Sequence, residues 1–487
     1  KWIDKHPSLH KAKKSVRGRL ILSRLIVLVK DKKSKDRSGK IITKTKRRLL
    51  LNLKRSGITK ASVKAERVEL PRVLDVVFDA MEILRHARRR CSLPGRLRFL
   101  VLDFRHAFFN FPVGLDEQRY FAARFFKSVL VWRRAVQGSR GAPLICGRGL
   151  ALAMRLTGAL VDTQVSSSST YVDDPLSTFY GTDEETDRAI AKQVGGLLAI
   201  GYSLSFDKAQ DSSHHEEVVW TTAKFTFFDD TEAVRIEVKD ELIAEIHENV
   251  VDALKHHTIS LDDLRSLAGR ATSVASLIHV WRPFVAMLWA PLYDLRSRCH
   301  WNSSLVYRSA IEVAVKWIHA FTSGLRGTLT RTYFLEEYLS EGLDVEIVSD
   351  ASPVGGGAFL IEEGSIQQYF AEQHRPEDAE VLRATIGTSV SQQVWEAFTV
   401  LCALRVWGPR WRFRRIHLRV KTDNVAALIM VVKLKATGFG VSLISREMAL
   451  DIAEAHYTPQ VAAHLPGQAN LTADFLSRHY DHEAVAL

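Results

Sequence analysis

Two adjacent carboxylates at an expected turn constrain this chain more than any other feature of its sequence. The stretch Tyr171–Asp174 ends in Asp173 and Asp174, and turn-rich sequence on both sides predicts a tight hairpin that presents them. Asp103 lies upstream in a strand-like apolar run, residues 99–104. Two separated carboxylate positions on one sheet are what a two-metal phosphoryl-transfer centre requires. Taken alone, an Asp-Asp pair is more often an ordinary polar turn.

The composition describes a basic, globular chain of several domains. Its 487 residues are 46% hydrophobic and 25% charged, which is typical of globular proteins. A chain of this length is expected to form roughly two to four domains. The formal net charge of +13 favours a polyanionic partner, although a basic protein without such a partner is the alternative from charge alone.

The cysteines are far apart and form no metal-binding cluster; they are Cys91, Cys146, Cys299 and Cys402. They predict free thiols in a reducing compartment, and therefore an intracellular protein of the cytoplasm or nucleus that is not secreted. No apolar run reaches membrane-spanning length, so no membrane partner is expected. The chain begins at Lys1 without a signal-peptide pattern, which suggests a piece of a longer polyprotein.

Residues 1–65 are strongly basic and predict a hairpin with cations at its tip. An apolar strand over 20–29 is followed by a charged, exposed turn over 30–40, and then by a second basic run, Lys44, Lys46, Arg47 and Arg48. Such a hairpin could grip a triphosphate or a nucleic-acid backbone, while a solvated charge run is the plainer interpretation. Helical spacing beyond it predicts helices over 68–90, 144–160 and 184–200, and a mostly helical region over 241–340.

Residues 343–487 have the pattern of a mixed sheet covered by helices. Strands are expected over 345–350, 358–361, 416–422 and 461–465, with a glycine turn at 355–357. Helices are expected over 392–407, from Asn424 and from Leu471. This order of elements indicates an α/β or α+β module.

Several motifs occur in a fixed order in the first half of the chain. Asp103 is followed by Phe108, Gln137-Gly138, Tyr171-Val172-Asp173-Asp174 and Lys208. In this order and spacing, residues 20–240 resemble the fingers and palm of reverse transcriptases of the retrotransposon and retroviral group. The resemblance implies RNA-directed DNA synthesis by two-metal nucleotidyl transfer, with Mg²⁺ as the expected ion and Mn²⁺ as a substitute.

The resemblance assigns the catalytic positions of this first set. Asp103 and Asp173 would be the metal ligands, with Asp174 completing the carboxylate cluster. Lys208 would protonate or neutralise the leaving pyrophosphate, although a surface lysine is the alternative. Clustered carboxylates repel one another, so the metal-free site is expected to be strained and partly protonated.

The same resemblance assigns the nucleotide-binding positions. Phe108 would be the aromatic gate under the sugar, favouring deoxynucleotides, with a core aromatic as the alternative. Gln137 and Gly138 would border the incoming nucleotide, the glycine allowing close backbone approach. Arg48, with Lys44 or Lys46, would contact the triphosphate.

Two positions depart from the pattern of the family. Its usual acidic and basic residues after the fingers arginine appear here as Asn52 and Lys54. Pro175 directly follows the Asp-Asp pair and removes a backbone donor at the start of the return strand. The hairpin tolerates this proline if it lies at the turn or faces away from the ladder.

A second set of acids is spread over the C-terminal module. It comprises Asp350 within Ser349–Ser352, Glu396 on an expected helix, Asp423 beside Asn424, and Asp474 within Ala473–Arg478, which follows His464–Gly467. Across 343–480 this set resembles the ribonuclease H domain of long-terminal-repeat-type and DIRS-type retroelements. The resemblance implies four metal-binding carboxylates for hydrolysis, a His464 that helps product release or proton transfer, and an Asn424 that holds the hybrid's backbone. Each acid alone is more often a surface group, and His464 a packed or surface histidine.

Between the two sets, Leu261–Leu295 resembles the segment that joins polymerase and ribonuclease H in gypsy-like and DIRS-type elements, with plain helical packing as the alternative. The sequence therefore predicts an α/β and α+β multidomain chain, a right-hand polymerase (fingers, palm and thumb) followed by a ribonuclease H-like mixed-sheet domain. The expected divisions are 1–240 for fingers and palm, 241–342 for a helical thumb or connection, and 343–487 for the ribonuclease H-like domain.

The partners expected from the resemblance are an RNA template, a DNA primer, an RNA–DNA hybrid and dNTPs, and the oligomeric state stays open. Phosphate contacts from a basic surface would weaken steeply with salt. Two alternatives are kept. One is a catalytically inactive, repurposed nucleic-acid-binding remnant of a retroelement, and the other is a DNA-templated polymerase with an attached nuclease.

Overall fold

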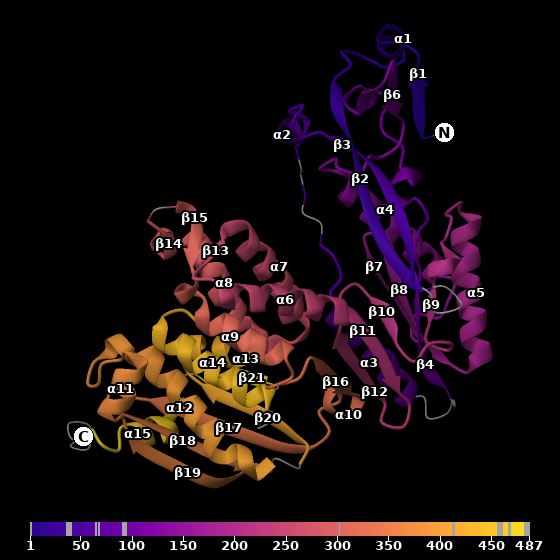
Figure 1. Cartoon of the computed structure of the whole chain (residues 1–487). Coiled ribbons are helices and arrows are strands. Elements are labelled where there is room, and N and C mark those ends of the chain that lie inside the picture. The colour runs from indigo at the N-terminus through magenta and orange to yellow at the C-terminus, as the bar shows by residue number, and fades with distance from the viewer. Residues whose placement is uncertain are drawn as a thin grey trace. The chain divides into compact units, whose positions relative to one another are not determined.

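The computed structural model describes residues 2–35, 41–63, 66, 69–89, 95–300, 302–411, 414–454, 461–465 and 469–481. These residues form a mixed α/β structure with several sheets (Figure 1). Two compact units are present, Lys1–Thr221 and Thr222–Leu487, and each is described by itself. The finer division into a polymerase part, a connection and a ribonuclease H-like part stays a prediction.

The first unit contains two sheets and the helices that pack on them. Its strands are β1 (Ile3–His6), β2 (Leu22–Lys35), β3 (Ile41–Asn52), β4 (Arg96–Val101), β5 (Ala122–Phe125), β6 (Ser128–Trp132), β7 (Ser166–Tyr171), β8 (Asp174–Gly181), β9 (Gln210–Asp211) and β10 (Val218–Trp220). Its α-helices are α1 (Leu9–Lys14), α2 (Ile58–Ala61), α3 (Val73–Arg89), α4 (Ala142–Gly158) and α5 (Asp183–Ala199). The last three lie where helical spacing predicted them.

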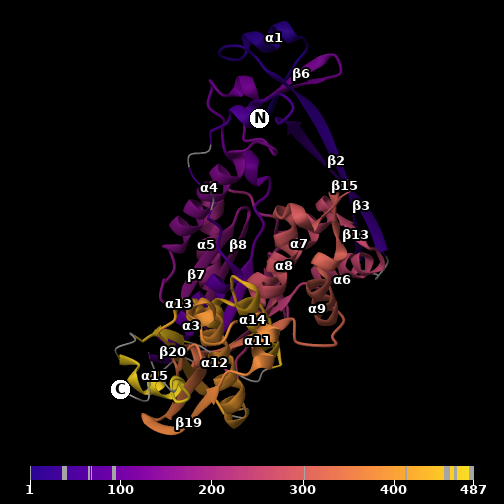
Figure 2. The same ribbon diagram turned by 90° about the vertical axis from the view of Figure 1, so that its left-hand side faces the viewer.

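The sheet with strand order β7-β8-β4-β9 carries the first set of acids. The serine run forms most of β7, and alternate hydroxyls point to opposite sides. Ser167 donates to Asp79 of α3 at 2.6 Å, whereas Ser168 accepts from Gln193 of α5 at 2.9 Å. These two helices therefore cover opposite faces, with α4 beside α5 (Figure 2). On the face covered by α5, a buried apolar cluster joins β4 and β8 of the sheet to α4 and α5.

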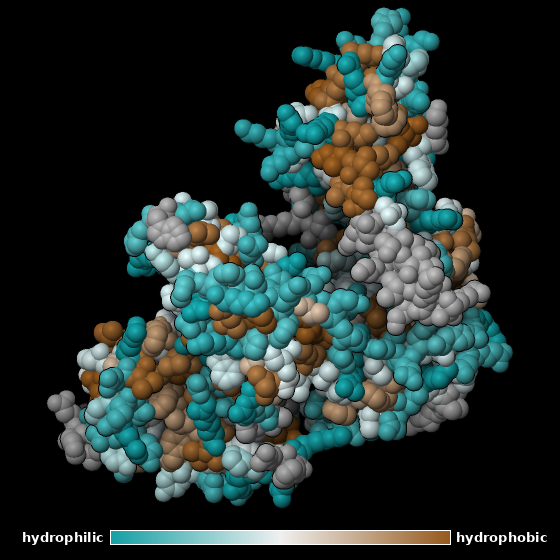
Figure 3. Space-filling model, viewed as in Figure 1, coloured by the Kyte–Doolittle hydropathy of each residue, from teal (hydrophilic) through white to brown (hydrophobic). Residues whose placement is uncertain are grey.

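The other sheet of this unit has the order β1-β6-β5-β2-β3 and ends in a long two-stranded ribbon. The exposed turn predicted over 30–40 is wrong in part, because β2 continues to Lys35 and β3 begins at Ile41. Antiparallel pairing along the whole ribbon, from Arg24↔Asn52 to Lys35↔Ile41, holds this lysine-rich stretch extended. Apolar side chains gather over β2 and β3 (Figure 3), and the exposed ones include Val27, Leu28 and Val29.

The second unit joins small sheets, a helical region and a larger mixed sheet. Its strands are β11 (Ala223–Phe228), β12 (Ala233–Val238), β13 (Thr258–Ser260), β14 (Arg298–Cys299), β15 (Asn302–Tyr307), β16 (Thr330–Phe334), β17 (Leu343–Ala351), β18 (Gly355–Glu362), β19 (Ser365–Gln373), β20 (Ile416–Thr422) and β21 (Val461–His464). Its α-helices are α6 (Asp240–Lys255), α7 (Leu261–Leu277), α8 (Arg282–Tyr293), α9 (Glu312–Thr322), α10 (Leu335–Tyr338), α11 (Pro376–Leu382), α12 (Gln392–Trp407), α13 (Val425–Lys433), α14 (Phe439–Ala453) and α15 (Leu471–Ser477).

The larger sheet has the order β19-β18-β17-β20-β21, with β19, β18 and β17 antiparallel and β17, β20 and β21 parallel (Figure 1). This is the mixed sheet that the sequence predicts. The glycine turn predicted at 355–357 is wrong, because these residues begin β18. A Cβ on Gly356 would meet Thr399 Oγ1 of α12 at 2.2 Å, and one on Gly357 would meet Leu476 Cβ of α15 at 2.4 Å. The glycines therefore let two helices approach opposite faces of the strand.

The region 241–340 is mostly helical, as expected, and also contains the short sheet β13-β15-β14 and strand β16. Trp281, Phe284 and Phe321 are almost fully buried there, so these aromatic side chains form a core. The cysteines that the structure describes, Cys146, Cys299 and Cys402, form no disulfide. Within the described ranges, none of the helices combines the length and the apolar character needed to cross a membrane.

Candidate functional site

The backbone of the first unit brings Asp103 alongside the Asp-Asp hairpin. Leu102 donates its amide to the carbonyl of Pro175 at 3.0 Å, and Phe104 donates to the carbonyl of Asp173 at 3.3 Å. Asp103 lies between these two donors, so the two backbone hydrogen bonds hold it next to the turn. Two carboxylate positions that are distant in sequence therefore meet at one end of β4 and β8.

The hairpin itself is tight, with Val172 and Asp173 as its two loop residues between the paired Tyr171 and Asp174. Val172 has a φ of +57°, a strained conformation for a β-branched residue that persists only where the surroundings enforce it. Trp220 supplies part of that support, since its indole Nε1 donates to the carbonyl of Asp174 at 2.9 Å. Its ring also meets Tyr171 edge to face at 6.2 Å.

Pro175 satisfies neither of the two conditions that would make it harmless, since it lies in β8 between two neighbouring strands. It pairs with Thr170 across the hairpin, and its carbonyl accepts from Leu102. In an antiparallel pair, the amide nitrogen and the carbonyl of one residue face the same neighbouring strand. The proline nitrogen therefore faces Leu102, just beyond the end of β4, and cannot donate a hydrogen bond to it. The proline therefore costs one ladder bond where that ladder is ending.

Basic side chains compensate the charge of this first site. Lys208, on the short 3₁₀ helix Phe206–Lys208, places its Nζ 2.6 Å from Asp103 Oδ2. Burial raises the pKa of Asp173, and the charge of Asp103 raises it further. The charges of Arg48 and Lys208 act in the opposite direction on the same pKa. Asp103, Asp173, Arg48 and Lys208 thus interact as one electrostatic group.

A buried thiol lies behind this group and was missed by sequence reasoning. Burial, and to a smaller extent the charge of Asp173, raise the pKa of Cys146 to about 12. Cys146 is on α4 and belongs to the apolar cluster under the sheet, so it remains a neutral thiol at physiological pH. Nothing in the spacing of the cysteines indicated this electrostatic interaction.

The predicted nucleotide-binding residues lie in different surroundings. Phe108 is half-buried and packs against the apolar cluster of β4, α4 and α5, so its ring is in part a core aromatic. Gly138 has a φ of +101°, and a Cβ there would meet the carbonyl oxygen of Leu51 at 2.9 Å. Close approach to β3 therefore already requires this glycine, and Gln137 precedes it in the same turn. Arg48 is exposed on β3, while the side chains of Lys44 and Lys46 lie outside the described residues.

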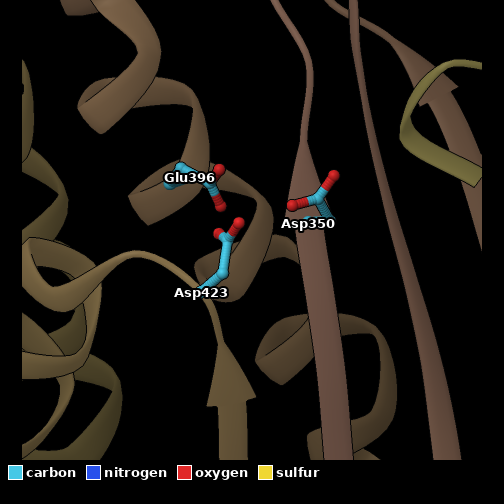
Figure 4. A group of neighbouring side chains, drawn as sticks. All are labelled: Asp350, Glu396 and Asp423. Carbon is cyan, nitrogen blue, oxygen red and sulfur yellow. The ribbon is translucent and has the colours of Figure 1, made fainter. Parts of the chain in front are cut away.

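The second unit gathers three carboxylates from three elements at the end of its larger sheet. Asp350 comes from β17, Glu396 from α12, and Asp423 directly follows β20 (Figure 4). One ligand oxygen of each lies within 4.8 Å of those of the other two. Among the described residues, no other group of three or more His, Cys, Asp or Glu side chains meets this distance, and the acids of the first unit do not.

Burial dominates the electrostatics of this triad. Asp350 is 5% exposed and Glu396 3% exposed. Burial, with a smaller contribution from the neighbouring carboxylates, raises the pKa of Asp350 to about 6 and that of Glu396 to about 8. None of the described basic side chains forms an ion pair with a member of the triad. The metal-free site is therefore expected to hold at least one proton at neutral pH.

Neutral side chains orient the triad, and sequence reasoning did not identify them. The Ser477 hydroxyl donates to Asp350 Oδ2 at 2.8 Å. Gln392 Nε2 donates to Glu396 Oε1 at 3.1 Å, and Thr422 Oγ1 donates to Glu396 Oε2 at 3.3 Å. Gln392 lies one helical turn before Glu396, a spacing that the sequence offered as a clue.

The remaining predicted residues of the second site are arranged less directly. Asp474 lies outside the triad and receives Arg478 Nε at 2.7 Å, although its charge helps raise the pKa of Asp350. Asn424 accepts hydrogen bonds from Ala426 N and Ala427 N, so it caps α13 instead of reaching outward. His464 ends β21 opposite Thr422, and its side chain lies outside the described residues.

The triad fits a hard divalent cation by the chemistry of its donors. Carboxylate oxygens are the ligands that Mg²⁺ and Mn²⁺ prefer, and two of these carboxylates are buried and form no ion pair with a described side chain. Burying several like charges costs free energy unless they are protonated or bound to a cation. The buried acidic triad is therefore a candidate metal site.

No protein-family model matches this chain, and no curated protein matches it by sequence. Among solved structures, a foamy viral protease-reverse transcriptase in complex with double-stranded DNA is similar at 16% identity and a TM-score of 0.44, over 91% of this chain and 66% of that chain. A foamy viral protease-reverse transcriptase in complex with an RNA/DNA hybrid is similar at 14% identity and a TM-score of 0.40, over 92% and 52%. The chain thus spans between half and two thirds of these neighbours. With TM-scores below 0.5, neither likeness carries weight for function.

Proposed function

We propose that this chain is an RNA-directed DNA polymerase with ribonuclease H activity, of the retroelement type. It would copy RNA into DNA in the first unit and cut the RNA of the hybrid in the second. The observation that carries the proposal is that acids distant in sequence lie close together in each unit. Asp103 is bonded beside the Asp173 turn, and Asp350, Glu396 and Asp423 lie within 4.8 Å.

In the first unit, the proposed polymerase residues divide the work by charge. Asp103, Asp173 and Asp174 would hold the metal ions. Lys208 carries a proton at Nζ that it could give to the leaving pyrophosphate, once its ion pair with Asp103 opens. Arg48 is exposed and electrostatically linked to Asp173, which suits a side chain that binds a triphosphate beside the carboxylates.

The nucleotide pocket is the looser part of the proposal. A partly packed ring such as Phe108 is held firmly, which suits a steric gate against a 2′-hydroxyl. Gln137 and Gly138 would border the base or sugar from the turn before α4. Gly138 has a structural reason of its own, so its role here rests on the motif and not on its φ.

In the second unit, Asp350, Glu396 and Asp423 would hold the ions, with Asp474 joining them after release from Arg478. Bound Mg²⁺ or Mn²⁺ would supply charge stabilisation at the phosphate and lower the pKa of the attacking hydroxyl or water. The carboxylates would be kept in orientation by Ser477, Gln392 and Thr422. His464 would assist product release or proton transfer. Expected partners are the RNA template, DNA primer, RNA–DNA hybrid and dNTPs.

The test is a pair of assays on the full chain with Mg²⁺. Primer extension on an RNA template should occur and be lost in an Asp173→Ala, Asp174→Ala double variant. Cleavage of hybrid RNA should occur and be lost in Asp350→Ala. Extension that persists in the double variant would show that the polymerase assignment is wrong. Binding of nucleic acid without either reaction would instead favour the inactive remnant, and extension on DNA but not on RNA would favour a DNA-templated polymerase.

A further inference from the structure

The β5–β6 hairpin carries two aromatic side chains in solvent at its tip. Phe126 is 85% exposed, the most exposed aromatic side chain among the described residues, and Phe125 is 40% exposed. Their rings meet edge to face, with centroids 4.8 Å apart and an interplanar angle of 80°. Aromatic rings left in water are unfavourable, so a pair of them on one turn favours a partner that covers them.

The backbone of this turn argues that the ring is retained for a purpose. Phe125 pairs with Ser128, so Phe126 and Lys127 are the two loop residues. Phe126 has a φ of +53°, where hairpin turns of this length favour glycine or asparagine. An L side chain in the left-handed region costs roughly 1–2 kcal/mol. Glycine would fit this position with less strain, yet the sequence has one of the largest apolar side chains there.

The charge around the tip identifies the kind of partner. Arg124 and Lys127 flank the two rings and are both exposed. From residue 118 to residue 161 the sequence has no aspartate or glutamate, while its basic residues are Arg119, Arg124, Lys127, Arg133, Arg134, Arg140, Arg148 and Arg155. Two cations beside two exposed rings match a polyanion that also presents flat apolar faces.

We infer that the tip of the β5–β6 hairpin binds unpaired RNA, with bases stacking on Phe126 and Phe125 and phosphates contacting Arg124 and Lys127. Unpaired strands offer free base faces for stacking, whereas the bases of a duplex are already stacked on one another. The choice of RNA over DNA rests on the proposed function. The stacking itself requires only a single strand, and none of the tip residues belongs to either set of acids.

The experiment measures fluorescence anisotropy of a labelled single-stranded RNA with the full chain, in EDTA so that neither reaction proceeds. Phe126→Gly is the decisive variant, because glycine relieves the positive φ while removing the ring. It should weaken RNA binding at least about fivefold, in line with one lost base stack, and leave the thermal unfolding temperature unchanged or higher. Phe126→Trp should keep the affinity. Arg124→Gln with Lys127→Gln should lower the salt dependence of binding.

The control is Tyr369→Ala, which removes a ring that is 70% exposed on β19 and has no adjacent cation. It should leave the affinity unchanged. The inference is overturned if Phe126→Gly binds RNA like the parent chain, or if it loses blunt-ended duplex equally. Tighter binding of single-stranded DNA than of RNA would overturn the choice of RNA. A parent chain that binds RNA through this tip but extends no primer would instead contradict the proposed function alone.

Discussion

The two sets of acids compensate their charge in opposite ways. In the first unit, Asp103 is 22% exposed and holds Lys208 at 2.6 Å, and Arg48 acts on Asp173 as well. In the second unit, Asp350 and Glu396 are almost fully buried, and the described side chains that donate hydrogen bonds to them are neutral: two hydroxyl groups and one amide. One site carries its own cations, while the other has none among the described residues that pairs with the triad.

This difference has a consequence for the metal-free protein. In the first site, the charges of Arg48 and Lys208 offset part of the rise that burial and the charge of Asp103 produce in the pKa of Asp173. The triad forms no ion pair with a described basic side chain, and burial outweighs the effect of the Arg478 charge on Asp350. Protons must therefore take up part of its charge, as the raised pKa values of Asp350 and Glu396 indicate. Metal binding should therefore displace a lysine at one site and protons at the other.

The largest expected effect separates the two sites by activity. Asp350→Asn should reduce hybrid cleavage on the order of 10³-fold or more, since several kcal/mol of metal stabilisation is lost, and leave primer extension unchanged. Asp103→Asn should do the reverse. Rates are measured for both reactions on the same preparations. The controls are Asp344→Asn on β17 and Asp116→Asn, which change exposed carboxylates in each unit. Loss of both activities from either single change would remove the distinction between the sites.

The second effect is on stability and has a defined sign. A carboxyl whose pKa is raised on folding binds more protons in the folded state. Stability therefore falls as the pH rises from the pKa of the unfolded state to that of the folded state. For Glu396 this range runs from its ordinary pKa of 4.5 to about 8. The metal-free protein should therefore lose on the order of a few kcal/mol between these pH values, and Mg²⁺ should restore stability most at pH 8.

Glu396→Gln should flatten that dependence, because the amide cannot titrate. The measurement is thermal unfolding in EDTA from pH 5 to pH 8, monitored by a signal that comes from the second unit. The Asp103→Asn variant serves as the comparison and should keep the parental slope. A parental slope in Glu396→Gln would mean that the triad is not the origin of the pH dependence.

The third effect concerns Lys208, the lysine that pairs with Asp103 in the first site. Lys208→Met should slow primer extension on the order of 10²-fold, as expected for loss of a proton donor. The unfolding free energy should change by less than about 1 kcal/mol, because the ion pair is partly exposed and solvent screens it. Single-turnover extension and chemical denaturation test the two parts. A large loss of stability with normal extension would make Lys208 a structural residue only.

Sequence periodicity predicted elements best where burial determines them. The expected helix over 392–407 and the expected strand over 416–422 are α12 and β20 with the same bounds. Both elements contain many buried apolar residues, so the spacing of apolar residues in the sequence indicated which face of each element is buried. The positions of Asp350 and Asp423 at one sheet edge follow from the same pattern, because Asp350 ends one expected strand and Asp423 follows another.

The failures occurred where distant parts of the chain decide the local structure. Lys30–Lys35 became strand because β3 pairs with it, and no local signal marks that partner. Gly355–Gly357 became strand because Thr399 and Leu476 pack where side chains would be. The positioning role of Ser477 was invisible for the same reason, since its partner Asp350 lies 127 residues away.

The smallest effect tests that long-range hydrogen bond. The Ser477 hydroxyl lowers the pKa of Asp350, so Ser477→Ala should raise this pKa further and make protons stronger competitors of a metal ion. We expect Mn²⁺ affinity at pH 6 to fall about fivefold, the equivalent of one hydrogen bond of about 1 kcal/mol, and the deficit to shrink by pH 8. Calorimetric titration across this range measures it. Ser445→Ala is the matched control, because it removes a buried hydroxyl of the same unit that has no partner among the described residues. An equal loss in both variants, or a loss independent of pH, would reduce Ser477 to a packing residue, and the triad would then depend on Gln392 and Thr422 alone for its orientation.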